Sequence, residues 1–296
     1  MNPDIFAEWF RLQERRVVQT QSTYWVEMGP YAYQAFPYHW TIEPNPEELN
    51  QLFKRYHALG LRYSLPPISN SGQASYHVVF TDRHYPLEKL KKKARYDVRK
   101  GLGLICIEPV PLHRLAAVGW DMRAETLARQ GRVKAESAVI WRRICESAAA
   151  LPGFESWMAY HGDEPAASLI AFTCGECCSI LFQQSLTAYL PKRVNHALLY
   201  VFTNAVLSQP GNMWIFYGLK SLDAPPGVDQ FKFRMGYLAK PVRQQVDFNP
   251  KVKFLINPTS YKMVTWLHHS FRHDARLAKV YGMLRSYLQS RINAAQ

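Results

Sequence analysis

Residues 166–186, AASLIAFTCGECCSILFQQSL, decide the fold that the sequence predicts. Mostly apolar runs lie on both sides of Gly175-Glu176, and this two-residue break predicts two strands joined by a tight turn. A strand at 156–160 precedes them across the polar turn 161–164. Strands joined by turns this short are antiparallel neighbours, so the segment predicts a three-stranded antiparallel meander.

The chain then continues as helix and strand. A helix is predicted over 193–208 and a strand over 213–217, followed by a short helix over 228–235 and a last strand over 242–248. The helix after the meander allows the next strand to run parallel to the third by a right-handed crossover. Parallel neighbours whose ends splay can admit a ligand beside a helix N-terminus, which attracts phosphate. The predicted class is α/β, with a mixed sheet flanked by helices.

Three regions are expected along the chain. Residues 1–102 form a smaller, irregular α/β unit that ends in a basic helix, residues 103–250 hold the mixed sheet, and residues 251–296 form a basic helical extension. The helix of the extension is expected after Asn257-Pro258. Its apolar side fits either packing on the domain or resting on an anionic membrane surface.

The net charge of +13 is confined to two segments. Residues 83–100 carry a net charge of +6 and residues 251–296 carry +7, so the rest of the chain is neutral. Charge gathered in two patches indicates attraction to an anionic partner, such as nucleic acid, membrane phosphate, a phosphorylated cofactor or an anionic substrate. The alternative is that both segments are solvated helix faces.

Several classes of protein are disfavoured. Five cysteines in 296 residues argue against a secreted disulfide scaffold, and the first residues lack the layout of a signal peptide. No apolar stretch is long enough to cross a bilayer, so a soluble, cytoplasmic protein is expected. The sequence has no nucleophile elbow, Walker loop or dinucleotide fingerprint.

No metal site is expected. Cys174, Cys177 and Cys178 lie around a predicted turn without a second cysteine pair, so paired strand cysteines explain them better than zinc. His269 and His273 have the i, i+4 spacing of metal ligands, but no glutamate accompanies them as in zinc proteases.

Three stretches resemble a known family. The order of elements from about residue 103 is similar to the acyltransferase fold of the GNAT superfamily, and more narrowly to its FemAB-like branch and the relatives grouped as Acetyltransf_6. The stretches that carry this resemblance are Lys93–Leu102, a basic helix, Pro165–Ile170, a strand of small residues, and Asp229–Tyr237, which resembles the family's late lysine and glycine motif. The resemblance makes the first hundred residues a shortened, degenerate copy of the same unit.

The resemblance implies transfer of an acyl or aminoacyl group to an amine. The expected donor is an acyl-CoA such as acetyl-CoA, and the expected acceptor is an amine of a small metabolite or sugar precursor. Lys232 would stabilise negative charge near the donor carbonyl or phosphate. Tyr217 would protonate the leaving group, and Asp223 would orient or deprotonate the amine. Their structural alternatives are an exposed helix lysine, a core aromatic residue and an ordinary loop residue.

The phosphate-binding loop departs from the family pattern. Residues 190–197 occupy its place and contain no glycine. Charge on Lys192 and Arg193 could replace backbone amides there, and Asn195 could cap the following helix. Gln184 is also assigned to donor binding. Arg95 and Arg99 are assigned to acceptor binding.

Two other functions therefore stay open. The donor could be an aminoacyl-tRNA, with the basic patches as docking surface for tRNA or another polyanion. The chain could also be a non-catalytic module that binds nucleic acid or a membrane surface.

Overall fold

The chain folds into two compact units, each made from several segments of the sequence. The computed structural model describes residues 2–132, 136–211, 214–220, 229–270 and 275–294. Unit 1 comprises Met1–Trp9, Val78–Gly218 and Pro226–Ala239. Unit 2 comprises Phe10–His77, Leu219–Pro225 and Lys240–Gln296.

Unit 1 contains the predicted mixed sheet. Its strands lie in the order β10-β9-β8-β7-β6, with the bounds β6 (Cys106–Val110), β7 (Phe154–His161), β8 (Glu164–Cys174), β9 (Cys177–Ser185) and β10 (Trp214–Leu219). Strands β6 to β9 are antiparallel neighbours, whereas β10 runs parallel to β9. The three-stranded meander followed by a parallel strand is therefore confirmed.

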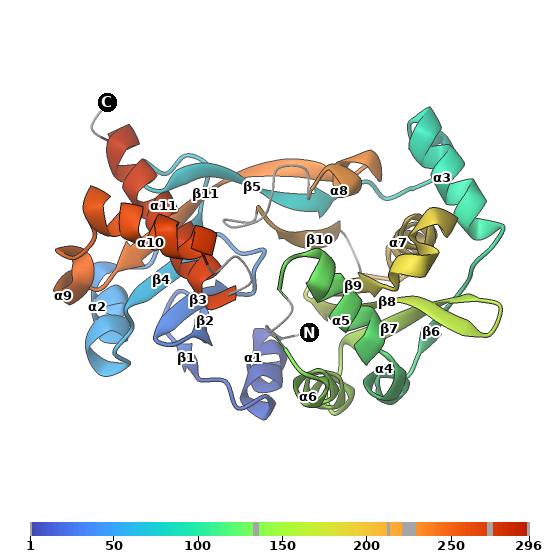
Figure 1. Ribbon diagram of the computed structural model, residues 1–296, viewed down its shortest axis with the longest axis horizontal. Helices are drawn as coiled ribbons and strands as arrows, with labels where there is room; N and C mark the ends of the chain where they lie inside the picture. The colour runs from blue at the N-terminus through green and yellow to red at the C-terminus, as the bar shows by residue number, and fades with distance from the viewer. Residues whose placement is uncertain (1, 133–135, 212–213, 221–228, 271–274, 295–296) are drawn as a thin grey trace. The chain divides into compact units, whose positions relative to one another are not determined.

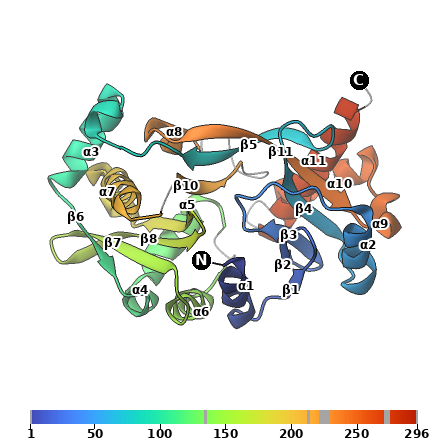
Figure 2. The same ribbon diagram turned by 180° about the vertical axis from the view of Figure 1, so that it is seen from behind.

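Helices cover both faces of this sheet. The helices of unit 1 are α3 (Lys92–Leu102), α4 (Leu112–Val118), α5 (Trp120–Arg129), α6 (Ala138–Ala149), α7 (Val194–Ser208) and the short α8 (Gln230–Arg234). On one face, Phe202 of α7 meets Trp157 of β7 with ring centroids 6.0 Å apart. On the other, Trp141 of α6 lies 5.8 Å from Phe182 of β9. Figures 1 and 2 both show α7 above strands β7 and β8, and α4 and α6 below them.

Unit 2 repeats the same order in shorter form. Its first elements are β1 (Val17–Gln19), β2 (Tyr24–Gly29), β3 (Ala32–Phe36), α2 (Pro46–Arg55) and β4 (Gly60–Leu65). Strands β1, β2 and β3 are antiparallel, and α2 leads into β4, which runs parallel to β3. Trp25, Leu52 and Leu61 form part of its fully buried core. That the first hundred residues are a degenerate copy of a GNAT-like unit stays a prediction.

Four elements contain residues of both units. They are α1 (Pro3–Leu12), β5 (Gln73–Phe80), β11 (Leu238–Phe248) and β10, whose last residue, Leu219, belongs to unit 2. The sequence analysis assigns no helix to the segment of α1. In unit 1, its Trp9 indole donates a hydrogen bond of 3.1 Å to the carbonyl of Ile144.

The C-terminal extension consists of helices that belong to unit 2. They are α9 (Pro250–Lys253), α10 (Pro258–Ser270) and α11 (Ala275–Ala294), which confirms the helix predicted after Asn257-Pro258. Leu284 and Tyr287 of α11 are buried against Val246 and Phe248 of β11. Strand β11 in turn pairs antiparallel with β4.

The two units divide the chain differently from the three predicted regions. The basic helix α3 belongs to unit 1, although the sequence analysis ends the first region with it, and the extension after residue 250 shares unit 2 with the first strands. Both differences arise from tertiary packing. Helix α3 packs on α7, and α11 packs on β11, so each joins the unit that buries its apolar side.

A glycine and a buried carboxylate fix α3 to the first turn of α7. A Cβ on Gly101 would lie 2.8 Å from the Cβ of Ala197 and 2.9 Å from the carbonyl oxygen of Arg193. The Asp97 side chain is only 6% exposed, and its Oδ1 lies 2.9 Å from Nε of Arg193. The close approach of the two helices thus depends on the absence of a side chain at position 101.

We predict that Gly101→Ala destabilises the protein. In an open helix this change would add about 1 kcal/mol of stability. Here the new methyl group overlaps Ala197 and a main-chain oxygen, so we expect a loss of about 1–3 kcal/mol. The matched control is Gly103→Ala, because a Cβ there would have no neighbour closer than 3.7 Å. Thermal unfolding of both variants tests this, and equal melting temperatures would contradict the packing described.

Candidate functional site

The two parallel strands of unit 1 separate after a short paired stretch. Trp214, Ile215 and Phe216 of β10 pair with Cys177, Cys178 and Ser179 of β9. Beyond these, the two strands share no further pair in the described part of the chain, although β9 continues to Ser185 alongside β8. The pairing of the two parallel strands thus ends at Phe216 on β10 and at Ser179 on β9.

The exposure of β9 marks where the strands part. The first four residues of β9 and its last two are buried, whereas Leu181, Phe182 and Gln183 between them are only partly buried. A bulge occurs at the same place, because Ile180 faces Ala171 and Phe182 faces Ile170, which leaves Leu181 without a partner on β8. Bulges bend a strand and redirect its side chains. The middle of β9 is therefore more exposed than its ends, and the bulge redirects its side chains.

Gly218 lets β10 bend away. Its φ of +126° lies in a region that residues with a side chain rarely adopt. The Nζ atom of Lys232 lies 3.8 Å from the position that a Cβ on Gly218 would take. The glycine thus provides both the bend and the space for the lysine.

Lys232 and Tyr217 are brought together as the sequence analysis assumed. Lys232 Nζ lies 4.7 Å from the centroid of the Tyr217 ring and 2.8 Å from Oδ1 of Asp229. The side chains of Lys232 and Asp229 are 15% and 12% exposed, so the pair is shielded from most solvent. Asp229 lies one helical turn before Lys232, and this i, i+3 spacing places the carboxylate beside the ammonium group.

Tyr217 connects this pair to β9. Its hydroxyl donates a hydrogen bond to Oε1 of Gln183. Gln183 Nε2 in turn donates to the main-chain oxygen of Asn195 on α7, at 3.3 Å. Burial, with the carboxylate of Asp229 as the second cause, raises the pKa of Tyr217. The hydroxyl is therefore a protonated donor at neutral pH.

The predicted phosphate-binding residues do not form one cluster. Helix α7 begins at Val194, so Asn195 is not its N-cap, and its side chain instead donates to Oγ of Ser185 at 3.1 Å. Lys192 Nζ lies 2.7 Å from Nε2 of His161. Arg193 holds Asp97, as described above. Both cations thus have partners within the chain, and their role toward a donor stays a prediction.

Gln184 lies on the opposite face of β9 from Gln183. It is 1% exposed, and its Nε2 donates to Oγ of Ser168 at 2.8 Å. Its Oε1 has no hydrogen-bond partner within the described residues. Gln184 is the glutamine predicted from the sequence to bind the donor, whereas its neighbour Gln183 was not predicted. The bulge at Leu181 shifts the alternation of faces along β9, and the sequence gives no signal for it.

The remaining predicted residues lie elsewhere or outside the described part. Arg95 donates to the carbonyl oxygens of Leu90 and Glu88, at 3.0 and 3.2 Å. Arg99 lies on the exposed side of α3, with its guanidinium 4.0 Å from Glu88. Asp223 falls outside the described residues. Their catalytic or acceptor-binding roles stay predictions.

The described residues contain neither a candidate metal site nor a candidate membrane span. Within them, no group of three or more His, Cys, Asp and Glu side chains is placed to hold a metal ion. Cys174 and Cys177 face each other across the β8–β9 turn, as expected for paired strand cysteines. None of the helices there has the length and hydropathy needed to cross a membrane.

Comparison with known proteins supports the fold. No family model and no curated protein matches the sequence. Among solved structures, the chain is similar to FemX at 10% identity and a TM-score of 0.55, over 84% of this chain and 92% of that one. It is also similar to the C-terminal domain of a putative lysylphosphatidylglycerol synthetase from Agrobacterium fabrum (10% identity, TM-score 0.53, 82% and 87% covered).

A third similar structure is L-PGS from Bacillus licheniformis, at 9% identity and a TM-score of 0.52, over 83% of this chain and 91% of that one. At such low identity these likenesses establish the fold alone. The resemblance drawn from the sequence is thus supported at the level of the fold: the chain has the same overall fold as FemX and these two structures.

Proposed function

We propose that the protein is an acyltransferase that moves an activated acyl group to an amine. One observation carries the proposal: strands β9 and β10 part beside Lys232, Tyr217 and Gln183. On this proposal a thioester or ester donor lies where the two strands part. A shielded cation and a neutral hydroxyl lie next to it, and both suit a carbonyl that gains negative charge.

The proposed chemistry needs a donor carbonyl that is polarised and a leaving group that receives a proton. The amine nitrogen forms a bond to the carbonyl carbon, the carbon–sulfur or carbon–oxygen bond to the leaving group breaks, and one proton passes from the amine to that group. Lys232 and main-chain N–H groups of the opened β9 edge would stabilise the oxyanion. Tyr217 would donate its hydroxyl proton to the leaving group and would regain a proton from the attacking amine.

The proposed donor is an acyl-CoA such as acetyl-CoA, and the proposed acceptor is an amine of a small metabolite or sugar precursor. The first turn of α7 lies beside the opened strand, because the main-chain oxygen of Asn195 accepts a hydrogen bond from Gln183. The partial positive charge of a helix N-terminus favours phosphate. We assign Lys192 and Arg193 to the donor phosphates and place the reaction in the cytoplasm.

We predict that Lys232→Ala lowers kcat about 10²- to 10³-fold, the usual effect of removing one oxyanion-stabilising group. The donor KM should change little, because the interaction strengthens only as charge develops. Release of free CoA from acetyl-CoA in the presence of mixed amine acceptors measures this. Lys232→Arg keeps the charge and should retain more activity, and Lys54→Ala on the exposed side of α2 is the matched control. Unaltered turnover in Lys232→Ala with an intact melting temperature would refute the assignment.

Donor binding can be tested without knowing the acceptor. We expect acetyl-CoA to raise the melting temperature, because a ligand at a hundred times its Kd stabilises the folded state by about 2.7 kcal/mol. Gly218→Val should abolish the shift, since the side chain would enter the space beside Lys232. No shift at millimolar acetyl-CoA would exclude CoA as the donor, while leaving an acyl donor of another kind.

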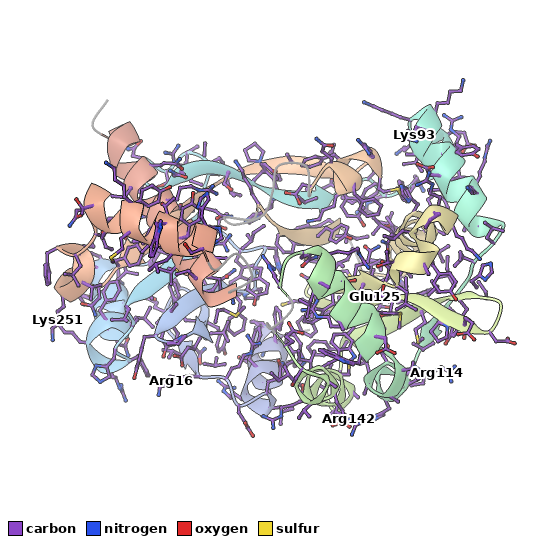
Figure 3. All side chains as sticks on the ribbon, in the orientation of Figure 1. Arg16, Lys93, Arg114, Glu125, Arg142 and Lys251 are labelled. Atoms are coloured by element: carbon purple, nitrogen blue, oxygen red, sulfur yellow. The ribbon has the colours of Figure 1, made fainter. Side chains whose placement is uncertain are left out.

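An aminoacyl-tRNA donor is the second candidate, and the outer face of α3 favours it. Exposed cations occupy this face at helical spacing, and Tyr96 among them is 61% exposed. They are Lys92, Lys93, Arg99 and Lys100. Lys93 is labelled on α3 in Figure 3, and its side chain is 75% exposed. Cations attract the RNA backbone, and an exposed aromatic ring can stack on a base.

We predict that tRNA binding, if it serves this reaction, depends on that face. The double variant Lys92→Glu/Lys100→Glu should weaken tRNA retention in filter binding and lower the salt slope by about one for each phosphate that is no longer neutralised. Lys54→Glu on α2 is the matched control. Equal binding by wild type and the α3 variant would remove the support that this face gives to a tRNA donor.

A further inference from the structure

The C-terminal helices of unit 2 expose large apolar side chains. Met263 and Trp266 of α10 are 58% and 65% exposed, and Phe254 and Leu255, in the turn between α9 and α10, are 74% and 55% exposed. Among the described residues, half of the large apolar side chains that are more than half exposed lie in this stretch. Isolated exposed apolar residues are ordinary, whereas four of them within residues 254–266 favour an interaction surface.

The orientation of α10 explains why these side chains face outward. Tyr261 and His268 stack on Tyr281 of α11, with ring centroids 5.7 and 4.7 Å apart, so they define the side of α10 that packs on the protein. Met263 and Trp266 are three residues apart and share one face of the helix. They lie away from Tyr261 around the helix axis, and the apolar packing within unit 2 does not use them.

Exposed lysines lie next to these apolar residues in the sequence. Lys251 and Lys253 precede Phe254 and Leu255, and Lys262 precedes Met263. Figure 3 labels Lys251 on α9. Residues 248–273 contain no Asp or Glu, and the segment from residue 251 to the end carries a net charge of +7. A partner for this surface must therefore accept apolar groups and supply negative charge.

We propose that this surface, named here the α9–α10 surface, binds an anionic lipid bilayer. It consists of Phe254, Leu255, Met263 and Trp266 together with Lys251, Lys253 and Lys262. Trp, Phe and Leu side chains enter the boundary between headgroups and acyl chains, and lysines beside them reach lipid phosphates. A second copy of the chain would bring like charges together, and RNA would leave the aliphatic Leu255 and Met263 without a partner.

The test uses the full-length protein and large unilamellar vesicles in a sedimentation assay. We expect binding to vesicles of phosphatidylcholine with phosphatidylglycerol, little binding to phosphatidylcholine alone, and weaker binding as salt is added. Met263→Ser/Trp266→Ser should reduce the partition coefficient at least tenfold. Lys251→Glu/Lys253→Glu should reduce it by about fivefold or more for each lysine. The melting temperature should stay unchanged, because all four side chains are exposed.

The controls separate a membrane from other partners. Ile68→Ser alters a side chain of unit 2 that is 89% exposed outside this surface, and it should bind vesicles like the wild type. Equal partition of wild type and Met263→Ser/Trp266→Ser would overturn the proposal. So would equal binding to neutral and anionic vesicles, loss of tRNA retention by the serine variant with vesicle binding intact, or a wild-type dimer in sedimentation velocity that the serine variant breaks. Vesicle binding does not require catalysis, so its result is independent of the acyltransferase assays.

Discussion

A β-sheet holds neighbouring strands together by continuous main-chain hydrogen bonds, and the pair β9–β10 gives up this pairing after three residues. The bulge at Leu181 and the positive φ of Gly218 turn the strands apart, and β9 keeps its pairing with β8 up to Ser185. A sheet that opens between two parallel strands exposes main-chain N–H groups that can donate hydrogen bonds to a ligand. In a fully paired sheet, helices or loops would have to provide such donors.

The polar groups around the opening form a connected chain rather than a set of separate interactions. Asp229 holds Lys232, Lys232 lies on the ring of Tyr217, and Tyr217 donates to Gln183, which reaches α7. Groups held in this way lose little freedom when a substrate arrives, which is the condition for electrostatic stabilisation of a developing charge. The ion pair between Asp97 and Arg193 connects α3 to the start of α7 in the same way.

The two units have a similar order of strands, but we propose different functions for them. In unit 2, α2 leads from β3 to a parallel β4, as α7 leads from β9 to β10 in unit 1. The proposed acyl-transfer site involves unit 1, whereas the apolar and basic surface of α9 and α10 lies on unit 2. The two patches of positive charge found in the sequence thus belong to different units. On our proposals, the patch on α3 binds RNA if the donor is an aminoacyl-tRNA, and the patch after residue 250 binds a lipid surface.

The sequence by itself determined the meander of β7, β8 and β9, the crossover to a parallel strand and the choice of Lys232 and Tyr217 as candidates. Turn residues and apolar periodicity are local signals, and they suffice for the strands and their order. The tertiary structure alone decided that Gln183 rather than Gln184 faces Tyr217, that Arg193 pairs with Asp97, and that Met263 and Trp266 stay exposed. A bulge of one residue reverses the face of every side chain that follows it, and an ion pair between residues almost a hundred positions apart depends on how two helices meet. Neither has a local signature in the chain, because both arise from packing between segments that the sequence keeps apart.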